Sequence, residues 1–447
     1  MPSNSFNRYI AAPLVLALAL GLAGCGAFKG KGKPATPTIG NRVPILSKID
    51  TSAKIDPTLA GQAVVLPPAV ENAEWAQAGG TASKSYGNLA LAAAPQQAWT
   101  ARIAGSTLKL RLAAAPVVGG GLVYAMGTDG VVHAFDAKTG SERWSQGFQI
   151  KGDGASAVYG GGASFSGERL FITTGMGEVA AINAADGKLL WKVKPAGPLR
   201  GSPTIAFNTV FVMTQANQIL ALNPDDGSQV WNKAASVGQT GVFGVAAPAA
   251  GQGTIIAGYS TGELIAYRYE NGRELWSDAL ARTSLSTSVG VLTDIDADPI
   301  IDRGRVYALG QGGRMAAYEL VTGQRIWELN LAGISTPAVA GDWIFTLTDD
   351  ARLLCIARST GKVRWLTQLN NFRNQKKKKD PIFWSGPVLA GDKLWFVNSQ
   401  GKVYSAAAAD GQPALFTDLQ APVTLAPVVA GSTLYVLDDS GRISAFR

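Results

Sequence analysis

The stretch GVVHAFDAKTGSERW, residues 130–144, decides the fold of this chain, because imperfect copies of it recur up to the C-terminus. Here Val131, His133 and Phe135 alternate with Val132 and Ala134 at the period of a β-strand. Residues 136–140 then supply a polar side chain that can bond its own turn and a glycine that tolerates positive φ. The stretch therefore predicts two strands joined by a tight turn, with Trp144 on the second strand as its largest apolar side chain.

Five further copies also end in tryptophan, and a weaker one ends in Phe416. The tryptophans are Trp144, Trp191, Trp231, Trp276, Trp327 and Trp365, separated by 47, 40, 45, 51 and 38 residues. These spacings match the roughly 40–50 residues of one propeller blade. A second recurring element, usually with a proline, opens each unit near Ala115, Ala157, Ser202, Ala247, Asp298, Thr336, Gly386 and Ala426. We therefore predict an all-β, eight-bladed β-propeller of four-stranded antiparallel blades.

The eighth unit is one strand short, because residues 441–447 complete its third strand and end the chain. A three-stranded blade would expose a sheet edge. Residues 96–101, ahead of the first unit, carry Trp99 without a turn of their own. We predict that N- and C-terminal strands close the ring together, with this segment as the missing outer strand.

The N-terminus has the pattern of a lipoprotein signal. Arg8 precedes an apolar run, residues 10–22, that is too short and too rich in alanine for a membrane span. The run ends in LAGC, residues 22–25, which resembles the bacterial lipobox, in which cleavage precedes a cysteine that is then lipidated. A plain secretory signal is the alternative, and Gly26 in place of Asp favours sorting to the outer membrane by the same resemblance.

Three segments follow from these patterns. We predict a lipoprotein signal peptide at residues 1–24, a flexible tether at 25–63 after lipidated Cys25, and the propeller at 64–447.

Catalytic constellations are hard to assemble from this composition. His133 is the single histidine, and Cys355 is the only cysteine besides Cys25, so a His/Cys metal site or a Ser/His/Asp triad has few candidates. The repeats resemble those of pyrroloquinoline-quinone (PQQ) enzymes, which makes a periplasmic PQQ-dependent quinoprotein dehydrogenase, or a subunit of one, the alternative function. The adjacent cysteine pair of the alcohol dehydrogenases in that class is missing. We predict a binding protein that is no enzyme and has no cofactor or metal.

The chain is basic, with 40 Lys and Arg against 32 Asp and Glu. Part of this charge is the run Lys376–Lys379, in a long loop ahead of the seventh unit. A solvated loop and attraction to anionic lipid or to an acidic partner are both open readings. Nucleic acid is not an expected partner for an exported lipoprotein.

The lipobox, the tether and an eight-bladed propeller of quinone-enzyme-like repeats without the quinone site together resemble the BamB family, lipoproteins of the outer-membrane β-barrel assembly machinery (the BAM complex). The resemblance implies a non-catalytic scaffold, lipid-anchored at the periplasmic face of the outer membrane. It implies binding to the POTRA domains of the insertase BamA and to other subunits of the machinery. Unfolded outer-membrane protein clients are a further partner class that it leaves open.

The partner-binding face of that family includes a Leu-x-Leu-Arg-Gly turn and an Asp-x-Asp loop. Residues 197–201, GPLRG, match the first with Gly197 in place of the first leucine, and residues 294–296 match the second. The resemblance thus implies partner contacts by Leu199, Arg200, Gly201, Asp294 and Asp296. Both stretches precede first strands, so we expect them at the same end of the propeller. The alternative for Arg200 and Asp294 is ordinary loop polarity or mutual ion pairing.

Overall fold

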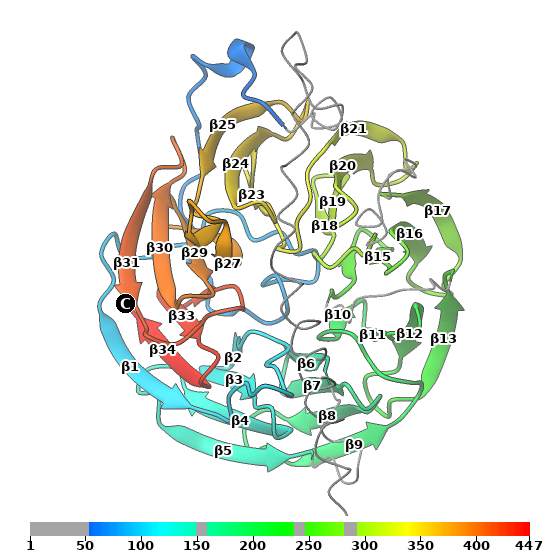
Figure 1. Ribbon diagram of the computed structural model, residues 1–447. Helices are drawn as coiled ribbons and strands as arrows, with labels where there is room; N and C mark the ends of the chain where they lie inside the picture. The colour runs from blue at the N-terminus through cyan, green and yellow to red at the C-terminus, as the bar shows by residue number, and fades with distance from the viewer. Residues whose placement is uncertain (1–52, 149–158, 237–245, 281–292) are drawn as a thin grey trace, which may run out of the picture. The chain divides into compact units, whose positions relative to one another are not determined.

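The computed structural model describes residues 53–148, 159–236, 246–280 and 293–447. The predicted signal peptide and Cys25 lie outside the described residues. Within them the chain forms eight four-stranded antiparallel sheets, which are the blades of a propeller, and one two-stranded hairpin (Figure 1). No helix in the described ranges is long and apolar enough to cross a membrane. The predicted all-β, eight-bladed architecture is confirmed.

Each blade runs from an inner to an outer strand in chain order, with one exception at the closure. Blades one to four contain β2 (Val117–Gly119), β3 (Leu122–Met126), β4 (Val131–Asp136), β5 (Glu142–Gly147); β6 (Gly161–Ser166), β7 (Arg169–Thr174), β8 (Val179–Asn183), β9 (Leu189–Val193); β10 (Thr204–Ala206), β11 (Thr209–Met213), β12 (Gln218–Leu222), β13 (Gln229–Ala234); and β14 (Ala249–Gly251), β15 (Thr254–Gly258), β16 (Glu263–Arg268), β17 (Glu274–Ala279).

The later blades repeat this order. Blades five to seven contain β18 (Ile300–Asp302), β19 (Arg305–Gly310), β20 (Arg314–Glu319), β21 (Arg325–Leu329); β22 (Ala338–Ala340), β23 (Trp343–Leu347), β24 (Arg352–Ala357), β25 (Val363–Gln368); and β28 (Trp384–Ala390), β29 (Lys393–Asn398), β30 (Lys402–Ala407), β31 (Pro413–Asp418). The hairpin β26 (Phe372–Asn374) and β27 (Lys379–Pro381) lies between blades six and seven in the chain.

The eighth blade joins the two ends of the propeller. It has the order β1-β34-β33-β32, formed by β1 (Gln97–Arg102), β34 (Arg442–Phe446), β33 (Thr433–Leu437) and β32 (Val428–Ala430). Strand β1 is antiparallel to β34, and Trp99 pairs with Ala445. The predicted closure by the segment around Trp99 is therefore confirmed.

The recurring Gly and Trp of the repeat form joints between neighbouring blades. The Trp144 ring of blade one lies under the turn of blade two, where its Nε1 donates to the Ala184 carbonyl at 3.0 Å. A Cβ added at Gly187 in that turn, where φ is +74°, would lie 2.7 Å from the Trp144 ring. Trp99 completes the ring in the same way by donating to Ala137 of blade one at 3.1 Å. The turn glycine is thus required both by positive φ and by the tryptophan of the preceding blade.

The same joint recurs around the ring. The remaining indole donations to the next blade are Trp191 to Pro224, Trp231 to Tyr269, Trp276 to Leu320, Trp327 to Arg358 and Trp365 to Ala408, at 2.7–3.0 Å.

Residues 65–91, which we call the hub segment, contact the inner strand or inner turn of every blade (Figure 1). Its contacts with blades one to five are Trp75 N to Val118 O, Phe165 N to Ala76 O, Gln77 with both polar backbone groups of Ile205, Ala250 N to Ala82 O, and Ile301 N to Ser83 O. Pro67 lies against Gly341 in blade six, and Leu89 and Asn72 exchange hydrogen bonds with blades seven and eight. The hub segment thus provides hydrogen-bond partners for backbone groups of inner strands that have no neighbouring strand on that side.

Residues ahead of the hub segment also contact the propeller. The backbone N–H of Asp56 donates to the Val363 carbonyl at 2.8 Å, and Lys362 forms an ion pair with Asp56 at 3.1 Å. Arg364 Nε donates to the carbonyl of Gln62 at 2.6 Å. The segment from residue 53 to 63, which belongs to the predicted tether range, is thus held against the outer strand of blade six.

Candidate functional site

The two ends of the propeller differ in what they carry. In a four-stranded antiparallel blade, the loop from the outer strand to the next inner strand always emerges at the same end. We call this the connecting-loop end; it includes residues 103–116, 194–203, 293–299 and 369–383. The opposite end, with the tight turns and the hub segment, is the turn end. Both predicted partner-binding stretches lie at the connecting-loop end, as expected.

The backbone holds the first stretch in place along blade three. Leu199 forms an isolated bridge with Thr214, and the Arg200 N–H donates to the Met213 carbonyl at 2.8 Å. The Arg200 carbonyl accepts from Gly161 N in blade two, and the Gly201 carbonyl accepts from a threonine hydroxyl of that blade. Leu199 is fully buried.

Arg200 reaches across to the second stretch. Its Nη2 lies 2.7 Å from Oδ1 of Asp294 and 3.2 Å from Oδ1 of Asp296. The side chain of Arg200 is 0% exposed, that of Asp294 1% and that of Asp296 10%. Sequence regions almost one hundred residues apart, from loops before blades three and five, are therefore joined by one ion-pair cluster.

Burial limits what this cluster can do by direct contact. Arg200 and Asp294 have their charges directed at each other and present no surface to an approaching protein. Gly197 and Pro198 are exposed beside them. The five residues of the predicted site are brought together by the fold, but the ion-pairing alternative describes their side-chain contacts.

The ion-pair cluster includes buried polar atoms that form no hydrogen bond with the described residues. Nε and Nη1 of Arg200 and Oδ2 of Asp294 are buried without a hydrogen-bond partner among the described residues. A buried charge network is stabilising when it is complete and costly when a partner is lost. The cluster is therefore sensitive to any change in the position of either loop.

The hub segment contributes a second buried charge. Lys84 is fully buried, and its Nζ donates to Thr204 Oγ1 at 3.2 Å. Burial lowers the pKa of Lys84 to about 8, against the opposing attraction of Asp298. Burial also raises the pKa of Asp298, which is opposed by Lys84. Sequence reasoning missed this lysine, although it is the single basic residue between Lys54 and Arg102.

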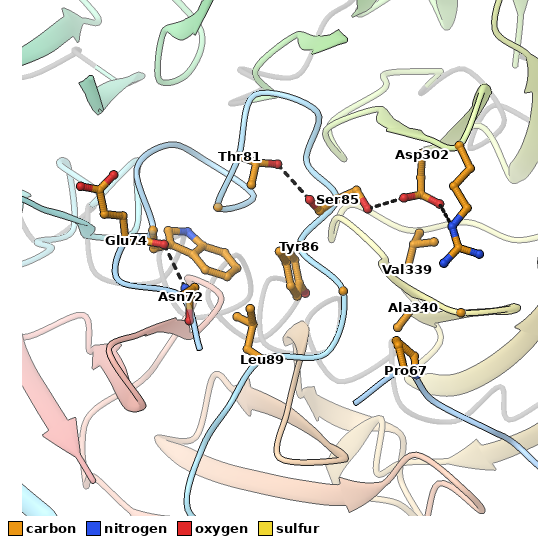
Figure 2. Close-up of a pocket in the computed structure, with 15 residues that line it drawn as sticks. Pro67, Asn72, Glu74, Thr81, Ser85, Tyr86, Leu89, Asp302, Val339 and Ala340 are labelled. Atoms are coloured by element: carbon orange, nitrogen blue, oxygen red, sulfur yellow. Dashed lines mark hydrogen bonds and ion pairs between the residues drawn. The ribbon is translucent and has the colours of Figure 1, made fainter. Parts of the chain in front are cut away.

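A cavity of about 380 Å³ opens at the turn end between the hub segment and blades five and six (Figure 2). Trp75 and Tyr86 line it with ring centroids 4.9 Å apart. On its other side Asp302 accepts from Ser85 Oγ at 2.8 Å and pairs with Arg358 at 2.7 Å. The polar groups of this wall are thus engaged with one another.

The described residues contain no group of three or more His, Cys, Asp and Glu side chains arranged to hold a metal ion. His133 lies on β4 with Nδ1 3.0 Å from Glu142 of the neighbouring strand. Cys355 is buried in β24, and burial raises the pKa of its thiol. The His133 side chain is thus paired within its own blade, and Cys355 is part of the packed interior of its blade.

Sequence comparisons relate the chain to one family. The family model described as "Outer membrane protein assembly factor BamB" matches residues 47–158 and 128–367. A relative of that name from Salmonella typhimurium is 34% identical over 287 residues, which cover 63% of this chain and 72% of the relative. Another from Escherichia coli K12 is 30% identical and covers 68% of this chain and 78% of the relative.

Solved structures share the fold at lower identity. The crystal structure of BamB from Moraxella catarrhalis has a TM-score of 0.66 at 21% identity, covering 79% of this chain and 99% of that one. A quinohemoprotein alcohol dehydrogenase from Comamonas testosteroni has the same TM-score at 14% identity, with 85% and 81% covered. These likenesses show the propeller and do not distinguish an assembly factor from an enzyme.

Proposed function

This chain belongs to the BamB family of outer membrane protein assembly factors, and from that membership we propose that it is a non-catalytic scaffold that binds the POTRA domains of the insertase BamA. The alternative function is that of a quinoprotein dehydrogenase. The dehydrogenase described above shares the fold but is only 14% identical to this chain, whereas the assembly factors are 30–34% identical. Lipidation of Cys25 and anchoring at the periplasmic face of the outer membrane belong to the same proposal. The observation that carries it is sequence identity spread over most of the propeller.

We place the partner-binding face at the connecting-loop end, around Leu199, Arg200, Gly201, Asp294 and Asp296. The buried ion pair supports a structural role for Arg200 and Asp294 in this face, because it joins the loops before blades three and five. The exposed Gly197 and Pro198 and the partly exposed Asp296 form the surface above it. Arg200 and Asp294 act in this proposal as positioning residues.

Affinity purification from detergent-solubilised membranes tests the function. The parent chain is expected to recover a barrel insertase, and Arg200→Ala or Asp294→Arg to recover less, because either change disconnects the two loops. Arg143→Ala is the matched control, since Arg143 forms an ion pair at the turn end. Undiminished recovery by folded Arg200→Ala and Asp294→Arg would remove the assigned face, and absence of any insertase with the parent would remove the function.

A titration with pyrroloquinoline quinone and calcium tests the alternative function. Stoichiometric binding of pyrroloquinoline quinone and calcium, accompanied by dye reduction, would support a dehydrogenase. We expect neither, because the relatives that are at least 30% identical to this chain are named as assembly factors.

A further inference from the structure

The basic hairpin, residues 372–381, is held firmly at its base and is exposed along its length. Phe372 pairs with Pro381 and Asn374 with Lys379 across β26 and β27. Immediately after it, Ile382 is buried, and its N–H donates to the Asn371 carbonyl at 2.8 Å. Residues 373–381 are all exposed. The hairpin therefore presents its side chains to solvent from a fixed position at the connecting-loop end.

The charge of this hairpin is concentrated and unpaired. Arg373 and Lys376–Lys379 face only Asp380 as an acidic residue within the hairpin. In the part of the chain that the structure describes, none of these five basic side chains forms an ion pair, whereas Arg143 and Arg325 elsewhere do. Like charges this close repel one another, so the hairpin is complementary to an external anion.

The residue types favour a lipid surface over a protein partner. Lysine is depleted in protein interfaces, where arginine and aromatic side chains supply most of the binding energy. A lysine is a hydrated point charge that suits diffuse attraction to many anionic headgroups. Phe383, two residues after the hairpin, is 64% exposed, and Leu108 at the same end is 99% exposed. Exposed apolar side chains beside clustered lysines are typical of segments that bind the membrane interface.

We propose that the basic hairpin and Phe383 bind the surface of an anionic phospholipid bilayer, with the lysines at the headgroups and the phenylalanine inserted between them. This contact would orient the connecting-loop end toward the membrane. The proposal does not rest on insertase binding, because its evidence comes from a different loop from the one that contains Arg200.

A fluorescent label on the hairpin tests the proposal in the full chain. Gln375→Cys places a solvent-sensitive dye on the hairpin, and Lys138→Cys places the same dye on an exposed turn at the opposite end. Cys355 is buried, and the unsubstituted chain labelled in parallel reports any reaction at Cys25 or Cys355. Each protein is mixed with vesicles of phosphatidylcholine alone or with added phosphatidylglycerol.

We expect a blue shift at position 375 with the anionic vesicles only, and no shift at position 138. The shift should disappear in about 1 M salt, where the Debye length is about 3 Å. Replacing Lys376–Lys379 by glutamine should remove the blue shift at position 375 without loss of folding, because these side chains are exposed. No shift, an equal shift with neutral vesicles, or a shift produced only by solubilised insertase would overturn the lipid assignment.

Discussion

Replacing Arg200 by methionine should be among the most damaging single changes in this propeller. The substitution removes the cation that lies 2.7 Å from Asp294 and 3.2 Å from Asp296 and leaves two carboxylates together on one loop. Losing one partner of a buried pair costs about 3–5 kcal/mol, because the other charge stays buried without compensation. Since Arg200 and Asp294 are 0% and 1% exposed, we expect a loss within this range.

Arg143→Met is the matched control for this prediction. Arg143 lies at the same 2.7 Å from Asp136, but its side chain is 57% exposed. Exposed pairs contribute about 0.2–1 kcal/mol, so the two variants should differ by roughly 3 kcal/mol in free energy of unfolding. Urea unfolding followed by far-UV circular dichroism gives this difference, and the slopes with denaturant check that the transitions are comparable.

One further measurement identifies the cause of the loss. Arg200→Met with Asp294→Leu should recover most of the stability, because no carboxylate is then left in the fully buried position. Equal losses for Arg200→Met and Arg143→Met would refute this reasoning.

Other features give sharper structural tests. Deleting residues 96–103 should lower the melting temperature of the whole domain, and Trp99→Ala should cost about 3–5 kcal/mol, while Leu108→Ala at a fully exposed site should change nothing measurable. Gly187→Ala should destabilise by about 1–3 kcal/mol more than Gly167→Ala, because both have positive φ but only Gly187 faces the Trp144 ring; equal losses in urea titrations would contradict the joint. Because the pKa of Lys84 is about 8 in the folded state and 10.5 ordinarily, the cost of burying its charge is present below pH 8 and is lost at higher pH. The parent should therefore gain stability relative to Lys84→Met between pH 8 and 10, and a constant difference would contradict this.

The repeat in the sequence predicted the blades because each of the first six contains its own turn and a tryptophan on its outer strand. Trp99 even predicted the closing strand, since an indole without its own turn needed a neighbouring blade. The pairing of Trp144 with Gly187 was not predicted, because a repeat does not say whether two of its residues meet within one unit or between units.

The hub segment and the buried charges were beyond sequence reasoning for a different reason. Residues 65–91 have no period of their own, since each of their contacts is with a different blade. Leu199, Arg200, Asp294 and Asp296 were expected to lie at one end, and they do. Their burial could not be read from two short loops, because it depends on the distance between blades three and five.

The hub segment also has a consequence for how the chain folds. It is synthesised before any blade, yet Asn72 finds its partner Val429 only 357 residues later. Pairing of β1 with β34 must wait equally long for the C-terminus. Contacts between residues this distant in sequence form slowly during folding. Partly folded intermediates meanwhile expose apolar surface and unpaired strand edges. An unfinished chain can therefore build blades one by one, but the hub segment gains its contact with Val429, and the eighth blade its outer strand, only after the C-terminal residues have been made.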